Sequence, residues 1–309
     1  IPIRSQTLEG SLSLTGGLVD DLTLRQYHET TDKNSPNIIL FVPEGAQNSY
    51  FSEFGWTSTD KAMNMPGRST PWTVAQDQTL TPESPVVLTY VNESGLHFQR
   101  TISLDKDYLF TITDEVTNNS KSPLVLAPYA LIARDARPQS ASSLFAALFE
   151  GPLGVLNQSL HEISYADLLE KRTESFVSTG GWVGITDKYW LSALLVKPEN
   201  TIKARFQGMP AKGEKPALYQ TDYLFDSQTL APGQSSSVTH YLYAGVKVVD
   251  LLDRYETELN IPMLDRAVDF GWFYVITKPI FFLLGYIHDL VGNFGISLLI
   301  LTVMIRLLF

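Results

Sequence analysis

The sequence predicts a mainly β protein, a large antiparallel sandwich followed by connector helices, an interfacial amphipathic helix and one transmembrane helix. Three observations lead to this fold class. Short apolar and β-branched runs, separated by turn residues, fill residues 1–245. From about Val246 the apolar residues recur at helical spacing instead. The final stretch, residues 292–309, is almost entirely apolar, which is the composition of a membrane span.

Residues 1–245 are expected to form the sandwich because their strand-like runs are many and their helical stretches few. Residues 142–149 are compatible with a short helix or a loop, since Gly151-Pro152 and Gly154 follow at once. Residues 208–217 are expected to be an exposed loop. The predicted strands are Leu12–Leu14, Leu22–Tyr27, Ile38–Val42, Val86–Tyr90, Leu96–Ser103, Tyr108–Val116, Leu124–Ala130, Phe176–Val177, Gly181–Ile185, Trp190–Val196, Ile202–Gln207, Tyr219–Phe225 and Ser236–Ala244.

The acidity of the chain lies in this first part. The formal net charge is −10, and from residue 270 onward only Lys278, Asp289 and Arg306 are charged, a net of +1. Residues 1–269 therefore carry about −11. So acidic a domain repels nucleic acid, which is excluded as a partner, and is not expected to lie flat on anionic lipid.

Several classes of site are excluded by composition. The chain has no cysteine, so disulfides, thiolate catalysis and cysteine metal sites are impossible. There is no His-x-x-x-His and no clustered Asp pattern with a Gly turn, so neither a metal nor another cofactor is expected. The first residues lack the features of a signal peptide. Both ends are interpreted as those of a segment taken from a longer chain.

Residues 246–268 are expected to form connector helices. Val248-Val249, Leu251-Leu252 and Tyr255 sit at helical spacing, and Pro262 separates them from a second short turn at Met263–Val268. Packing of this connector on the edge of the sandwich is the preferred interpretation. The alternative is a docking surface for a partner or for a membrane core.

Residues 269–291 are expected to form an aromatic-rich amphipathic helix in the membrane interface, where Trp and Tyr anchor at headgroup depth. Proline should break or start a helix at position 279. The polar residues of this segment, including Lys278 and Asp289, share one face of the predicted helix. The candidate anchoring residues are Trp272, Phe273, Lys278, Pro279, Phe281, Phe282 and Tyr286.

Residues 292–309 are predicted to cross the bilayer. Eighteen residues at the helical rise span about 27 Å, close to the hydrocarbon thickness. Gly292, Asn293 and Gly295 mark the helix entry. Arg306, the only charged residue here, either snorkels to the inner surface or is held below it, facing a watery cavity.

The C-terminal residues resemble the YidC family of bacterial membrane insertases. The resemblance rests on Asp269-Phe270-Gly271-Trp272-Phe273, Lys278-Pro279, His288, Gly292-Asn293-Phe294-Gly295-Ile296-Ser297 and Arg306. It is supported by Gly180-Gly181-Trp182-Val183-Gly184-Ile185, closely followed by Tyr189-Trp190, and by Tyr243-Ala244-Gly245.

The resemblance implies a β-supersandwich similar to galactose mutarotase in the periplasm, and a five-helix membrane core with a hydrophilic groove. The residue that matches Arg306 lies in that groove and attracts polar or acidic stretches of the substrate. The implied location is the bacterial inner membrane. The implied partners are nascent membrane proteins, the lipid bilayer, SecYEG and SecDF, with ribosome contact only through parts outside this sequence.

Two rival functions remain at this stage. A mutarotase-like sandwich can process sugars with a His acid and a carboxylate base. No spacing pairs His28, His97, His161, His240 or His288 with a carboxylate such as Glu93, Glu150 or Asp222, so the chain is not expected to be an enzyme. The second rival is a sandwich that binds carbohydrate or peptide and is held by a simple membrane anchor.

Overall fold

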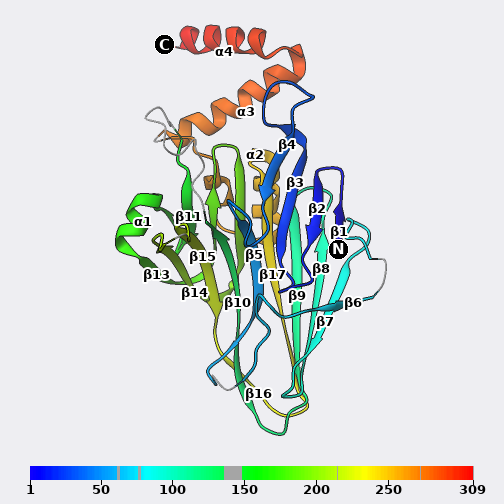
Figure 1. Ribbon diagram of the computed structural model, residues 1–309. Coiled ribbons are helices and arrows are strands. Elements are labelled where there is room, and N and C mark those ends of the chain that lie inside the picture. The colour runs from blue at the N-terminus through cyan, green and yellow to red at the C-terminus, as the bar shows by residue number, and fades with distance from the viewer. Residues whose placement is uncertain (61–62, 76–77, 136–147, 214, 272, 309) are drawn as a thin grey trace. The chain divides into compact units, whose positions relative to one another are not determined.

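A computed structural model describes residues 1–309 except 61–62, 76–77, 136–147, 214, 272 and 309 (Figure 1). The described chain falls into two compact units, Ile1–Ala267 and Val268–Phe309. The strands are β1 (Pro2–Arg4), β2 (Leu8–Leu12), β3 (Val19–His28), β4 (Asn37–Phe41), β5 (Tyr50–Ser58), β6 (Thr73–Val74), β7 (Val86–Val91), β8 (Leu96–Leu104), β9 (Leu109–Asn118), β10 (Leu124–Arg134), β11 (Gly151–Leu156), β12 (Ser159–Glu162), β13 (Thr173–Thr186), β14 (Trp190–Met209), β15 (Leu218–Phe225), β16 (Gln228–Leu230) and β17 (Ser235–Val246). The helices are α1 (Tyr165–Lys171), α2 (Val249–Leu259), the 3₁₀ helix η2 (Leu264–Ala267), α3 (Tyr274–Val291) and α4 (Phe294–Leu308).

The strands of the first unit form two antiparallel layers that share two long strands. One layer runs from β6 through β7, β8, β9 and β17 to the first part of β14. The other runs from β5 through β10 and β15 to the last part of β14. Because β14 pairs with β17 at Trp190–Leu195 and with β15 at Ile202–Met209, it passes from one layer to the other, and β13 accompanies it. The predicted mainly β, antiparallel fold class is confirmed.

The Gly-Gly-Trp segment has a structural explanation. Gly180 and Gly181 have φ of +66° and +113° at a break in the β13–β14 register. A Cβ on Gly181 would lie 2.2 Å from the backbone oxygen of Val155, and Trp182 next to it is fully buried. The two glycines therefore bend β13 where it changes layers and let β11 approach closely.

Some predicted boundaries were wrong. Phe176–Val177 and Gly181–Ile185 belong to the single strand β13, and β2 ends at Leu12 instead of including Leu14. Gly151-Pro152 and Gly154 do not end a helix but lie in the buried strand β11, where a Cβ on Gly154 would lie 2.4 Å from the Trp182 carbonyl oxygen. Most of the segment considered for a short helix, 142–149, lies outside the described residues.

Further strands and one helix were not predicted at all. The strand β5 is buried on both faces, so its sequence does not alternate between apolar and polar residues. The helix α1 is only seven residues long, and it begins where the Ser164 hydroxyl accepts a hydrogen bond from the Asp167 N–H. Neither element carries the periodicity on which the sequence prediction depended.

The connector packs on the sandwich, as the preferred interpretation expected. The helix α2 buries Leu252 and Tyr255, and the Tyr255 ring lies 5.9 Å from that of Tyr243 in β17. Arg254 forms an ion pair with Asp107 in the β8–β9 turn. This part of the chain therefore belongs to the first unit.

The second unit is a pair of helices. The predicted helix over 269–291 begins only at Tyr274, after Gly271 with φ of +73°. The prediction that Pro279 breaks or starts it was wrong, because Pro279 lies inside α3. Its missing N–H would have met the Val275 carbonyl, so the helix loses one hydrogen bond near its first turn and continues.

Candidate functional site

The apolar surface of the second unit is the candidate site for contact with lipid. In α3 and α4 most large apolar side chains are exposed, and the buried ones include Ile287 and Leu301. Keeping apolar side chains in contact with water costs about 25 cal/mol of free energy for each Å² of apolar surface. The two helices therefore present faces that an apolar environment would stabilise.

The predicted anchoring residues lie at the start and along the length of α3. Phe273 is 72% exposed and Tyr286 is 65% exposed. Phe281 packs its ring edge against Phe270, with the centroids 5.7 Å apart, and against Phe282. Trp272 lies outside the described residues. The exposed aromatic side chains match what an interfacial anchor needs, an apolar ring available to acyl chains.

Lys278 lies among the same rings. Its ammonium is 5.7 Å from the centroid of Tyr274 and 5.8 Å from that of Phe282. Such cation–π contacts stabilise an ammonium close to aromatic surface. Thr277 holds the start of the helix by donating its hydroxyl to the Phe270 carbonyl, a contact that sequence reasoning missed because it depends on the turn of the backbone before α3.

The predicted helix entry is a tight turn between α3 and α4. Gly292, with φ of +69°, ends α3, and its N–H donates to the His288 carbonyl. The Asn293 side chain then accepts a hydrogen bond from the Ile296 N–H and caps α4. The His288 and Phe294 rings stack across the turn with centroids 3.9 Å apart. Of the residues predicted here, Gly295 lies in the first turn of α4.

Arg306 lies on the face of α4 that is turned away from α3. Among the α4 residues whose side chains are described, Ser297 and Leu301 are buried and mark its contact with α3. At 100° per residue, Arg306 is half a turn around the helix from Ser297 and about 140° from Leu301. Arg306 is exposed. This face of α4 is therefore exposed in the part of the chain that the structure describes.

Length and composition separate the two helices. Among the described residues, α3 is long and apolar enough to cross a membrane, whereas Phe294–Leu307 forms a shorter apolar helix. An aromatic helix of this length suits either a span or the interface. The expected roles, α3 at the interface and α4 across the bilayer, stay a prediction.

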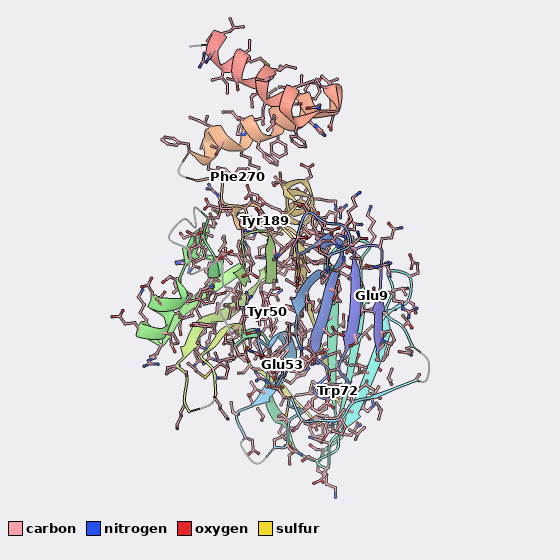
Figure 2. All side chains as sticks on the ribbon, turned by 45° about the horizontal axis from the view of Figure 1, so that its top comes forward. Glu9, Tyr50, Glu53, Trp72, Tyr189 and Phe270 are labelled. Carbon is pink, nitrogen blue, oxygen red and sulfur yellow. The ribbon has the colours of Figure 1, made fainter. Side chains whose placement is uncertain are left out.

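A groove crosses the sandwich in the first unit. It has a volume of about 710 Å³ and runs over β5, β10, β15, β14 and β13. On its central strand β15, Asp222 accepts hydrogen bonds from Arg205 and from the Gln220 amide. Exposed Val177 and half-buried Phe176 line the groove on β13. Tyr50 and Glu53 lie on β5 in the middle of the unit (Figure 2), and Glu53 accepts a hydrogen bond from the Tyr129 hydroxyl.

His240, which packs against the groove residue Tyr223, is a structural histidine. His240 is fully buried, and its Nδ1 lies 2.7 Å from the Tyr223 hydroxyl oxygen, while Asp222 is held by Arg205 and Gln220. Burial lowers the pKa of His240 to about 4. A buried imidazole that stays neutral and bonds a tyrosine is a structural hydrogen-bonding group.

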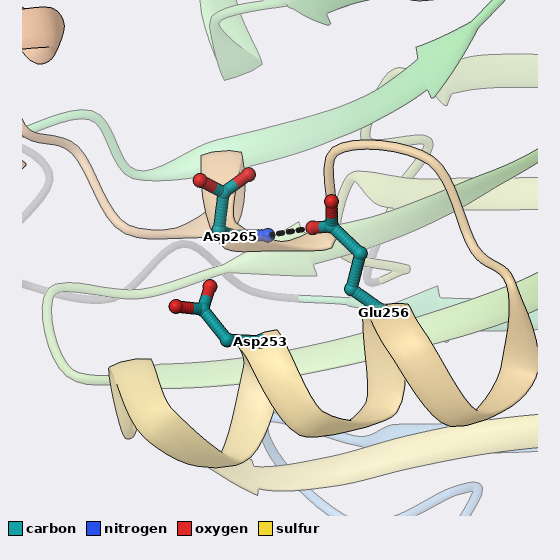
Figure 3. Close-up of side chains that lie close together, drawn as sticks. All are labelled: Asp253, Glu256 and Asp265. Carbon is teal, nitrogen blue, oxygen red and sulfur yellow. Dashed lines mark hydrogen bonds between the residues drawn. The ribbon is translucent and has the colours of Figure 1, made fainter.

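Three carboxylates of the connector lie together. Asp253 and Glu256 of α2 face Asp265 of η2, with one oxygen of each within 4.8 Å of the others (Figure 3). The backbone N–H of Asp265 donates to Glu256. Sequence reasoning missed this cluster because Pro262 separates its members. The arrangement joins η2 to α2, and it is not by itself a metal site.

Known protein sequences resemble this chain over its whole length. The family profile described as the YidC periplasmic domain matches residues 1–283. The chain is 41% identical over 309 residues to the membrane protein insertase YidC of Rickettsia bellii and 42% identical over 311 residues to that of Brucella suis. These matches cover all of this chain but 54% and 50% of the two relatives. The chain thus spans about half the length of the curated relatives it matches, which are named insertases and not enzymes.

Solved structures show where the fold recurs. A galactose mutarotase related enzyme from Lactobacillus acidophilus superposes with a TM-score of 0.53 at 10% identity, covering 79% of this chain and 96% of that one. A galactose mutarotase-like protein from Lactobacillus casei gives 0.50 at 13% identity, covering 79% and 99%. At such identities the likeness concerns the fold alone, and it confirms the expected mutarotase-like sandwich.

Proposed function

The chain belongs to the YidC family of membrane protein insertases, and from that premise we propose that it forms the periplasmic domain and one wall of the intramembrane groove of an insertase. The sandwich stands in the periplasm, α3 lies in the interface, and α4 crosses the bacterial inner membrane. The other walls of the groove come from helices outside this sequence. The proposed role is that of an insertase and chaperone for inner-membrane proteins.

The proposed mechanism needs no covalent chemistry. A hydrated groove partway into the bilayer shortens the apolar path for the polar tail of a nascent membrane protein. A guanidinium in that groove offsets the loss of hydration of a carboxylate in the tail. The apolar helix of the substrate then leaves along lipid-facing residues, driven by burial at about 25 cal/mol per Å².

The observation that carries the proposal is the position of Arg306. It is the only charged residue of α4, and it lies on the face opposite to Ser297, which packs toward α3. A guanidinium at the bilayer centre costs about 2.5–3.5 kcal/mol on insertion scales unless it faces water or a counter-charge. The exposure of Arg306 on the face away from α3 supports a role facing a groove built with further helices.

The partners follow from the same role. Nascent membrane proteins and the lipid bilayer are the direct ones. We include SecYEG and SecDF as partners in a Sec-dependent mode, beside a mode in which the insertase works alone.

The test replaces Arg306 in the full-length protein and follows insertion of substrates with acidic translocated tails in cells depleted of the native insertase. Arg306→Ala and Arg306→Met should reduce insertion several-fold, whereas Arg306→Lys should largely preserve it because the charge remains. Thr302→Ala is the matched control, since Thr302 lies one turn away on the same face and only bonds the Leu298 carbonyl. If the Ala variant is silent for every substrate, the groove role is wrong.

The groove of the sandwich favours a second candidate function, the binding of carbohydrate or extended peptide by a domain on a simple anchor. The charged pair Arg205–Asp222 and the apolar side chains of Phe176 and Val177 line the same groove, a combination typical of a site that orients a ligand. Glycan and peptide arrays with the full-length protein in nanodiscs test it. Binding that is lost in Asp222→Ala and kept in Arg306→Ala would favour this function. Arrays without a hit would exclude it.

A further inference from the structure

The turn between β13 and β14 exposes an aromatic side chain that the proposed function does not use. Tyr189 is 54% exposed, and its ring stands 5.9 Å from that of Trp190. Trp190 in turn contacts Tyr27 of β3 edge-on at 5.5 Å. The ammonium of Lys188 lies 4.9 Å from the Tyr189 centroid. Three rings and a cation thus gather at one end of the sandwich.

The same end carries the residues that lead into the connector. Trp190 pairs with Val246, the last residue of β17, and the Lys247 N–H donates to the Tyr189 carbonyl at 2.9 Å. The Lys247 ammonium bonds the Thr186 hydroxyl, and Val248 is exposed. We call Tyr27, Lys188, Tyr189, Trp190, Lys247 and Val248 the Tyr189 surface.

The chain leaves the first unit near the start of α2. After α2 it turns back, so that Asp265 faces Asp253 and Glu256 (Figure 3). Asp253 is four residues, about 6 Å of helix, from the first residue of α2. The final residue of the unit, Ala267, follows Asp265 by two positions. The exit to the membrane helices is therefore close to Lys247 and Val248.

The short stretch of chain between Ala267 and α3 limits how far this exit can lie from the bilayer. Seven residue steps separate Ala267 from Tyr274, the first residue of α3. At no more than roughly 3.6 Å per step, they reach at most about 25 Å. An α3 in the interface thus keeps the neighbourhood of Ala267 within reach of lipid headgroups.

The local charge of the Tyr189 surface differs from that of the whole domain. Lys188 and Lys247 supply two positive charges, and the neighbouring Asp187 is neutralised by Arg134, whose Nη1 donates to it at 2.7 Å. Two carboxylates lie nearby: Asp250 is exposed on the first turn of α2, and Glu150 accepts a hydrogen bond from the Lys188 N–H at 2.9 Å. The two lysines balance these two acids, so this end of an otherwise acidic domain is locally near neutral and offers amphipathic rings where its chain turns to the membrane.

We propose that the Tyr189 surface rests in the headgroup layer of the bilayer. Tyr189 and Trp190 place their rings at the level where aromatic residues of membrane proteins concentrate, and Lys188 and Lys247 bind lipid phosphate. This contact orients the sandwich on the membrane. It rests on the proposed function only in requiring the two terminal helices to be in the bilayer.

The experiment uses the absence of cysteine from the chain. Single variants Tyr189→Cys, Val91→Cys and Leu299→Cys are spin-labelled in nanodiscs of phosphatidylcholine and phosphatidylglycerol. Accessibility to oxygen, which enriches in lipid, is compared with accessibility to a water-soluble nickel chelate. Val91 is the matched control because it is 59% exposed and lies at the opposite end of the sandwich, on the strand β7. Leu299 in α4 reports membrane entry.

The label at position 189 should give an oxygen-to-nickel ratio several-fold above that at 91, and Lys188→Glu with Lys247→Glu should lower it toward the control. Equal ratios at 189 and 91, with lipid contact at 299, would overturn the inference and leave the insertase proposal standing. Equal ratios at all three positions would instead overturn both, because α4 itself would then be outside the bilayer. The Arg306 variants should leave the ratio at 189 unchanged.

Discussion

The two units of this chain differ in which side chains they bury and which they expose. The sandwich buries even charged side chains and gives them partners: Arg100 and Asp114, directly opposite on β8 and β9, are both buried and form a two-pronged ion pair. The helical unit leaves large apolar side chains exposed along α3 and α4. Water is thus a suitable solvent for the first unit, whereas the second presents an apolar surface that an apolar environment would stabilise.

The largest expected effect comes from removing one partner of the buried ion pair. The Arg100 guanidinium donates to both Asp114 oxygens and also to the carbonyls of Gly17 and Phe54, so it joins the β8–β9 hairpin to the β2–β3 turn and to β5. Arg100→Met should destabilise the sandwich by about 3–5 kcal/mol, because Asp114 stays buried without a counter-charge. Denaturant unfolding of the chain in detergent, followed by tryptophan fluorescence, measures the loss.

Two controls keep this prediction sharp. Arg25→Ala removes an exposed pair with Glu9, whose atoms are 3.8 Å apart, and should cost less than about 1 kcal/mol. The double variant Arg100→Met with Asp114→Leu should recover much of the loss, since no charge stays buried. An Arg100→Met variant as stable as the parent chain would contradict the idea that the sandwich depends on partnered buried charge.

His240 adds a pH dependence that only the sandwich should show. Burial lowers its pKa to about 4 from about 6.5. Above pH 6.5 the imidazole is neutral in both folded and unfolded chains. As pH falls from 6.5 to about 4, only the unfolded chain takes up the proton, so the free energy of unfolding falls, by about 3 kcal/mol in total.

The comparison with His240→Gln isolates this group, because burial also raises the pKa of Asp20 to about 6 and gives an opposite slope in part of the range. The parent chain should lose stability toward pH 4 more steeply than the variant, as measured by denaturation midpoints at fixed salt. Identical slopes would mean that His240 is protonated in the folded sandwich.

Sequence patterns recovered the parts whose periodicity is simple. The strand β8 alternates strictly between buried and half-exposed residues, and the connector carries apolar residues at helical spacing, so both were located. The strand β11 was missed because its glycines are required by close approach to β13, which is a property of the neighbour and not of the local sequence. The position of Pro279 inside α3 was missed for a related reason, since one lost hydrogen bond near a helix start is tolerated.

Less of the candidate site than of the fold could be predicted from the sequence. The type and order of its residues, from Phe273 to Arg306, can be read from the chain. The direction in which Arg306 points cannot, because it depends on which face of α4 packs on α3, and that contact is known only from the burial of Ser297 and Leu301. The Tyr189 surface escaped for the same reason, as it joins β3, the β13–β14 turn and the start of α2.

Two glycines, one in each unit, give the finest test of the comparison. Gly181 has φ of +113°, and a Cβ there would lie 2.2 Å from the Val155 oxygen, so Gly181→Ala should destabilise the sandwich by about 2 kcal/mol through backbone strain. Gly285 lies inside α3, and nothing lies within 4 Å of an added Cβ. Gly285→Ala should therefore leave the sandwich unchanged and stabilise the helix by up to about 1 kcal/mol, because alanine loses less backbone entropy than glycine. Amide hydrogen exchange in detergent measures both units at once. Faster exchange at β11 and β13 in the first variant, and slower exchange in α3 alone in the second, would show that the two units respond independently; a change that spreads from α3 into the strands would show that they do not.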